Sequence, residues 1–134
     1  MLNFWNLKFK KAVCYNLVTE KLGDYSHSKK GVYMSDNIEI REINGIDEVR
    51  FQPQGVCSKL MSIKIKDNKI LDMETVGGCS GNLKGIGSLV IGMDINDVIT
   101  RLQGLPCGSR PTSCPDQLSV ALKLYIEEKS KVVV

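Results

Sequence analysis

Two kinds of hydrophobic periodicity follow one another along this chain, and their order constrains the fold more than any other feature. From residue 37 to residue 76, apolar and polar residues tend to alternate, which is typical of strands with one buried face. After Gly77-Gly78, apolar residues recur every three or four positions, as on an amphipathic helix. Strands followed by helices indicate an α+β fold, with three helices on one face of a small antiparallel sheet of about three to four strands.

Two hairpins account for the predicted strands. The candidate segments are 37–42, 48–52, 60–66 and 69–76. Asn44-Gly45 separates the first pair and Asp67-Asn68 the second, and both dipeptides are common in tight turns. Within 60–66, Met61, Ile63 and Ile65 alternate with polar residues, so the second hairpin carries the clearest strand signal.

Three helices are predicted after the hairpins. Asp94 is suited to cap the second helix, and Gly104 to follow its end. The third begins near Ser113-Cys114-Pro115-Asp116, because proline fits a first helical turn and a carboxylate is stabilised there. The apolar faces consist, in order, of Leu83, Ile86 and Val90; of Ile95, Val98, Ile99 and Leu102; and of Leu118, Ala121, Leu122 and Tyr125.

The length and composition describe one ordinary domain. With 134 residues, of which 43% are hydrophobic and 25% charged, the chain has room for a single core. No apolar run approaches the roughly 20 residues that span a bilayer, and the N-terminal residues lack the pattern of a signal peptide. The sequence therefore predicts a cytoplasmic protein without a membrane partner.

The net charge of +3 comes from the N-terminal segment. Residues 1–33 carry six Lys against two acidic residues, whereas residues 34–134 carry twelve basic and thirteen acidic residues. Direct nucleic-acid binding is not expected, because it needs basic residues gathered on a folded face. The codons for residues 29–34 can contain a ribosome-binding sequence just before an AUG at Met34. We therefore predict that residues 1–33 are a non-native or disordered leader and that residues 34–134 form the single domain.

Four cysteines, Cys57, Cys79, Cys107 and Cys114, are the candidate functional residues, and the fifth, Cys14, lies in the predicted leader. A cytosolic protein uses cysteines for metal or redox chemistry more often than for disulfides. All four fall in predicted loops or at helix ends, and Cys79 and Cys114 lie where a helix dipole favours the thiolate. Four thiolates suit a tetrahedral zinc site. Because the paired C-x₂-C spacing of zinc knuckles is missing, redox-active thiols and plain packing residues stay open as alternatives.

Several motifs, taken in order, resemble the TSCPD domain family. They are Gly55-Val56-Cys57-Ser58, Gly77-Gly78-Cys79-Ser80-Gly81-Asn82, Cys107-Gly108 and Thr112-Ser113-Cys114-Pro115-Asp116. The resemblance covers residues 50–128. In that family the domain occurs alone and as the C-terminal module of cobalamin-dependent ribonucleoside-diphosphate reductases. The resemblance thus implies ribonucleotide reductase as a partner.

A more distant similarity links the chain to the U-type iron–sulfur cluster scaffolds, which combine a sheet with helices. Three scaffold ligands correspond by position to Cys57, Cys79 and Cys114. Lys59 stands where the scaffolds have an Asp, Ser113 stands where some have a His, and Cys107 is additional. These departures imply a closed and tightly held site for zinc or an iron–sulfur cluster, in preference to cluster transfer.

Whether the chain is an enzyme stays open at this stage. It is too small to be a complete reductase, and its glycines match no P-loop or dinucleotide-binding pattern. No His follows Met34 to act as a base near neutral pH, which lowers the case for a hydrolase. Three hypotheses result: a metal-binding module, a thiol redox accessory that passes reducing equivalents to ribonucleotide reductase, and a non-catalytic interaction domain.

Overall fold

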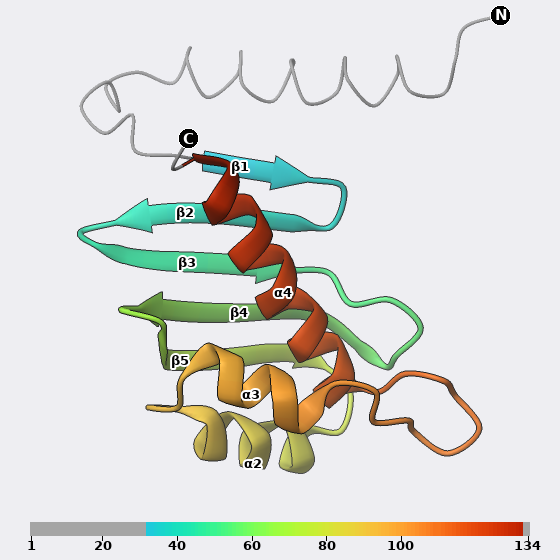
Figure 1. Ribbon diagram of the computed structural model, residues 1–134. Coiled ribbons are helices and arrows are strands. Elements are labelled where there is room, and N and C mark those ends of the chain that lie inside the picture. Colours follow the sequence, from blue (N-terminus) through green and yellow to red (C-terminus); the bar gives the residue numbers. More distant parts are fainter. Residues whose placement is uncertain (1–31, 133–134) are drawn as a thin grey trace, which may run out of the picture.

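The computed structural model describes residues 32–132, which form one antiparallel sheet followed by three helices (Figure 1). The strands are β1 (Val32–Ser35), β2 (Ile38–Ile43), β3 (Ile46–Phe51), β4 (Ser58–Lys66) and β5 (Lys69–Gly77), and the helices are α2 (Ser80–Val90), α3 (Ile95–Leu102) and α4 (Cys114–Val132). The strands lie in chain order as a meander. The predicted α+β class is confirmed, and the sheet has one strand more than the upper limit of the sequence prediction.

The additional strand, β1, spans the predicted boundary at Met34. Val32 and Tyr33 belong to the predicted leader, yet they pair with Arg41 and Ile40 of β2. Residues 1–31, which include Cys14, lie outside the described residues. The translation start at Met34 therefore stays a prediction.

Two-residue turns close both predicted hairpins. Asn44 and Gly45 have φ values of 53° and 76°, and Asp67 and Asn68 have 49° and 61°. Positive φ at both central residues is the geometry of a type I′ turn, whose twist matches that of the flanking strands. These local preferences fix the registers Ile43↔Ile46 and Lys66↔Lys69.

The two faces of the sheet differ sharply in polarity. One face is buried against the helices and consists of Ile38, Ile40, Val49, Phe51, Met61, Ile63, Ile65 and Ile70. The other face carries charged residues, and opposite charges lie across from each other on adjacent strands. These cross-strand pairs are Glu39↔Arg50, Arg41↔Glu48, Glu48↔Lys64 and Lys64↔Asp72. Such alternation is typical of an antiparallel sheet with one solvated face.

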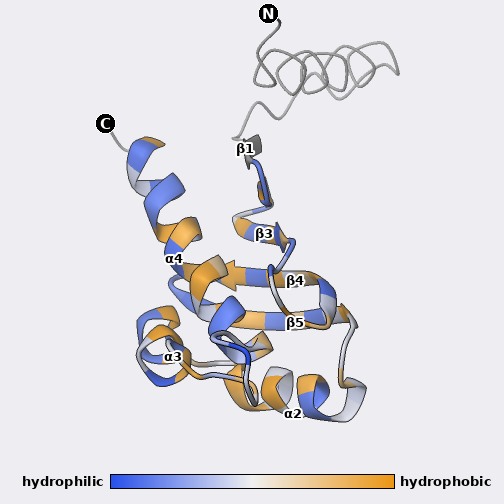
Figure 2. Cartoon of the chain, turned by 90° about the vertical axis from the view of Figure 1, so that its right-hand side faces the viewer, coloured by the Kyte–Doolittle hydropathy of each residue, from blue (hydrophilic) through white to orange (hydrophobic). Residues whose placement is uncertain are grey.

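The helices complete the core on the apolar face. α4 crosses the strands diagonally, and α3 lies beside it over the β5 end of the sheet (Figures 1 and 2). The predicted stripe of Leu118, Ala121, Leu122 and Tyr125 is buried. The link between α2 and α3 pairs with β5, because Gly92 donates to the Ile70 carbonyl at 2.7 Å. No helix within residues 32–132 is long and apolar enough to cross a membrane.

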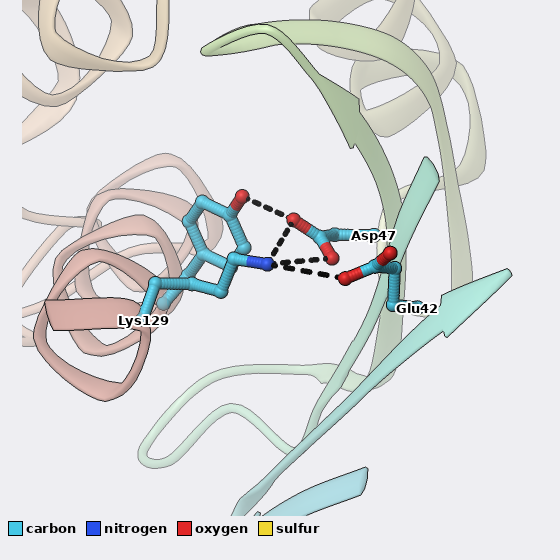
Figure 3. A network of polar contacts seen from close by, with 4 residues as sticks. Glu42, Asp47 and Lys129 are labelled. Atoms are coloured by element: carbon cyan, nitrogen blue, oxygen red, sulfur yellow. Dashed lines mark hydrogen bonds and ion pairs between the residues drawn. The ribbon is translucent and has the colours of Figure 1, made fainter. Parts of the chain in front are cut away.

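A polar network holds the C-terminal half of α4 on the sheet (Figure 3). The Tyr125 hydroxyl donates to Asp47 at 2.6 Å, and the Lys129 ammonium lies 2.9 Å from the same carboxylate. Glu42 lies 3.9 Å from Lys129 at the rim of the network. Burial and the hydrogen bond to Asp47 raise the pKa of Tyr125, so this phenol stays protonated and continues to donate.

Replacing Tyr125 with Phe should lower the free energy of unfolding by about 1–3 kcal/mol, because a hydrogen bond to a buried carboxylate is lost. Urea unfolding followed by circular dichroism measures the change. Lys131→Met is the control, since its ion pairs with Glu127 and Glu128 lie at the surface and should contribute less than about 1 kcal/mol. An equal loss in both variants would contradict a stabilising role for the buried hydroxyl.

Candidate thiolate site

The segments that carry the four predicted cysteines, namely the start of β4, the end of β5, the start of α4 and the loop before it, lie at one end of the sheet, on the right in Figure 1. Cys57 directly precedes β4, and Cys79 follows β5 as the N-cap residue of α2. Cys114 opens α4, and Cys107 lies in the loop between α3 and α4. The hairpin β4–β5 and the start of α4 thus bring together residues far apart in sequence. None of the four is in a disulfide, and all but the half-buried Cys114 are exposed.

The closest pair of thiols is Cys57 and Cys114, whose sulfur atoms are 3.9 Å apart. The Cys114 sulfur also lies 3.3 Å from the hydroxyl oxygen of Ser58, which is buried. The hydrogen bond with Cys114 is the main cause of a lowered pKa at Cys57. The hydrogen bond thus favours the thiolate form of Cys57.

Cys79 joins this pair because it lies close enough to Cys57 for each thiol to shift the pKa of the other. The charge on Cys57 is the main cause of a raised pKa at Cys79, with smaller contributions from Cys114 and Cys107. The helix position was expected to favour a thiolate at Cys79, whereas the neighbouring charge of Cys57 acts in the opposite direction and raises its pKa. Repulsion among these thiolates is a reason for such a site to attract a cation.

Two glycines allow the backbone to approach the site closely. Gly78 has a φ of +77°, and a methyl group there would lie 2.9 Å from Leu83 and 3.3 Å from the Cys57 sulfur. At Gly77, with a φ of +78°, a methyl group would lie 3.3 Å from the Cys57 carbonyl oxygen. Both positions combine a left-handed conformation with a lack of space. Gly77-Gly78 is therefore the element that places Cys57 beside Cys79.

α4 begins where the sequence predicted, and a serine caps its first turn. The Ser113 hydroxyl accepts a hydrogen bond from the Asp116 amide at 3.2 Å, which makes Ser113 the N-cap residue. The helix then presents Cys114 in its first turn. The Asp116 carboxylate accepts from the Thr112 hydroxyl and from the Gly104 amide, both at 2.6 Å, and these bonds lower the pKa of Asp116.

Cys107 is less closely integrated than the other three thiols. It lies in a tight turn in which Cys107 and Arg110 exchange two backbone hydrogen bonds, of 2.9 and 3.3 Å. Its charge contributes to the raised pKa of Cys79, so it lies within electrostatic range of the site. Lys59, at the start of β4, and Arg110, in the Cys107 turn, are exposed and make no ion pair with any residue from 32 to 132.

Ser58 and Gln117 are parts of the site that sequence reasoning missed. The Gln117 side chain is buried, accepts from the Gln54 amide at 2.9 Å and donates to the Thr112 hydroxyl at 3.0 Å. Its signal in the sequence is a polar residue four positions before Ala121, on the buried side of α4. Ser58 offered no comparable signal, since a serine beside a predicted strand is common.

The donor set suits a soft or borderline metal ion, because thiolates are the ligands that zinc and iron–sulfur clusters prefer. Within the described part of the chain, no group of three or more His, Cys, Asp or Glu residues is already arranged to hold a metal. The fold nevertheless brings the four predicted cysteines to one end of the molecule. It would need adjustment of its loops to close around an ion.

Comparison with known proteins gives one match. A family model described as the TSCPD domain matches residues 39–126, which extend from β2 into α4 and include all four cysteines of the site. No curated protein and no solved structure matches the chain.

Proposed function

The chain therefore belongs to the TSCPD domain family, and from that premise we propose that it is a metal-binding module whose four thiolates hold one zinc ion. The ligands would be Cys57, Cys79, Cys107 and Cys114. An ion at this place would supply a rigid cross-link between the sheet and α4.

The observation that carries the proposal is the 3.9 Å separation of the Cys57 and Cys114 sulfur atoms. Two thiolates on one tetrahedral zinc ion, each about 2.3 Å from the metal, lie about 3.8 Å apart. A disulfide would instead need about 2.05 Å. This distance suits two ligands on one metal ion, and Cys79 adds a third thiol close enough to Cys57 to influence its pKa.

Metal analysis of the full chain tests the proposal. We expect about one zinc per chain after anaerobic purification without added metal, since structural zinc is bound tightly. Iron with an equal amount of sulfide would favour an iron–sulfur cluster at the same cysteines. A preparation free of metal, which also fails to take up zinc when reduced, would refute the proposal.

A second candidate is a thiol redox role, which the lowered pKa of Cys57 favours. In this reaction the Cys57 thiolate attacks a disulfide of a partner protein and forms a mixed disulfide. Cys114 then displaces the partner, so a Cys57–Cys114 disulfide forms while the partner's disulfide is reduced to two thiols. Two electrons pass to the partner. Metal-free protein with a Cys57–Cys114 disulfide that titrates reversibly against glutathione would favour this candidate over zinc.

The proposed partner in either case is ribonucleotide reductase, and its support is the family resemblance, since the same domain forms the C-terminal module of cobalamin-dependent reductases. A module with its own core and an exposed cysteine end is suited to such an association. Co-purification of the tagged chain with reductase subunits, compared with a Cys57→Ser/Cys114→Ser double variant, tests whether the cysteine end takes part.

A further inference from the structure

We propose that Thr112, Asp116 and Gln117, together called the Thr112 cluster, are positioning residues that set the thiolate site. They fix the loops carrying Cys57 and Cys107 to the first turn of α4. The inference rests on the proposed metal site and says which residues determine whether it closes with four ligands.

Asp116 holds both ends of the loop that carries Cys107. One carboxylate oxygen accepts from the Gly104 amide, just after α3, and the other accepts from the Thr112 hydroxyl, just before α4, each at 2.6 Å. The carboxylate therefore closes the loop from residue 104 to residue 112. Cys107 lies inside this closed segment, and its own turn with Arg110 is stiffened by two backbone hydrogen bonds.

Gln117 holds the loop that carries Cys57. Its side-chain oxygen accepts from the Gln54 amide at 2.9 Å, across 63 residues of sequence. The methyl group of Thr112 lies near the same loop, since a methyl group added at Gly55 would be 3.4 Å from it. The segment between Gln54 and Cys57 is thereby fixed to the start of α4.

The Thr112 hydroxyl joins the two connections. It donates to Asp116 at 2.6 Å and accepts from Gln117 at 3.0 Å, so one oxygen atom links the two side chains that hold the loops. Cys114 lies between Thr112 and Asp116 in the chain. The Thr112 hydroxyl thus orients the two side chains that hold the loops of Cys57 and Cys107 against the start of α4. Groups that orient metal ligands in this way typically change metal affinity by about 10–100-fold when they are removed.

Cobalt(II) titration of the reduced full chain tests the inference, because cobalt reports thiolate ligands by its charge-transfer absorbance. In Thr112→Val we expect cobalt affinity to fall by about 10–100-fold. The absorbance per bound cobalt should fall by about one quarter as Cys107 leaves a four-thiolate set. Thr112→Ser, which keeps the hydroxyl, should restore both values. Thr100→Val is the matched control, since it removes a threonine hydroxyl bond in α3, away from the cysteines.

A role limited to stability would lower the melting temperature of Thr112→Val but leave its cobalt affinity and spectrum unchanged, and that result would overturn the inference. If Thr112→Val does not fold, Asp116→Asn, which keeps the shape of the side chain, should show the same direction of change. If the wild type binds no cobalt, the zinc proposal fails on its own. The Thr112 cluster is then tested by hydrogen exchange of the Gly104 and Gln54 amides, which Thr112→Val should accelerate by about tenfold; unchanged exchange would refute it.

Discussion

Replacing Cys114 with serine should reduce the zinc content of the purified chain from about one equivalent to less than about one tenth. Cys114 supplies the sulfur atom 3.9 Å from that of Cys57 and joins the site to α4. Without it, the remaining thiolates repel each other with no fourth ligand to complete a tetrahedron. Metal analysis and a zinc-chelator competition assay measure the loss. Cys14→Ser in the full chain is the matched control and should keep its metal, because Cys14 is not among the proposed ligands.

The same series decides the role of Cys107. If all four cysteines bind one ion, then serine at position 57, 79, 107 or 114 should give comparable losses. A full equivalent of zinc in Cys107→Ser would contradict the four-thiolate site and leave three ligands, as in the U-type scaffolds. If the cysteines serve only in packing, all four variants should be metal-free like the wild type.

Replacing Gly78 with alanine should lower the free energy of unfolding of the metal-free protein by about 2–4 kcal/mol. The left-handed backbone accounts for about 1–2 kcal/mol, and the contacts of the added methyl group with Leu83 and the Ser58 amide account for the rest. Urea unfolding in the presence of a reductant measures the change. Zinc affinity should fall too, because the methyl group also meets the Cys57 sulfur.

Gly45→Ala separates conformational strain from steric overlap. Gly45 has nearly the same φ, +76°, but a methyl group there has nothing within 4 Å. It should therefore cost only the strain, about 1–2 kcal/mol, and leave zinc binding unchanged. Equal losses of stability at Gly45 and Gly78 would show that the close approach at Gly78 is relieved without cost.

Local patterns in the sequence predicted most of the fold, because apolar residues alternate with polar ones in the strands and recur every three or four positions in the helices. Asp94 caps α3 by accepting from the Asn96 amide at 2.8 Å, as its position before an apolar stripe indicated. β1 escaped prediction, since four residues are too short to establish an alternating pattern.

The site was predictable in its membership but not in its electrostatics or its supports. The cysteines stood out by number and by their place in loops. The lowered pKa of Cys57 and the raised pKa of Cys79 depend on the proximity of thiols from different loops, which a local dipole argument does not include. The hydrogen bond between the Gln54 amide and Gln117 could not be predicted for the same reason, because it joins residues 63 positions apart.

The charged face of the sheet has a consequence for the accuracy of folding. A strand that slips by one residue would turn its apolar side chains toward water, so the hydrophobic pattern forbids odd shifts. A slip by two residues keeps the apolar side chains in the core, so the loss of apolar burial does not oppose it. On this sheet it would place Glu39 opposite Glu48, where the native partner is Arg50, or Arg50 opposite Lys64, where the native partner is Ser62. The charges on the solvent-facing side therefore disfavour registers shifted by two residues, which the burial of apolar side chains alone would allow.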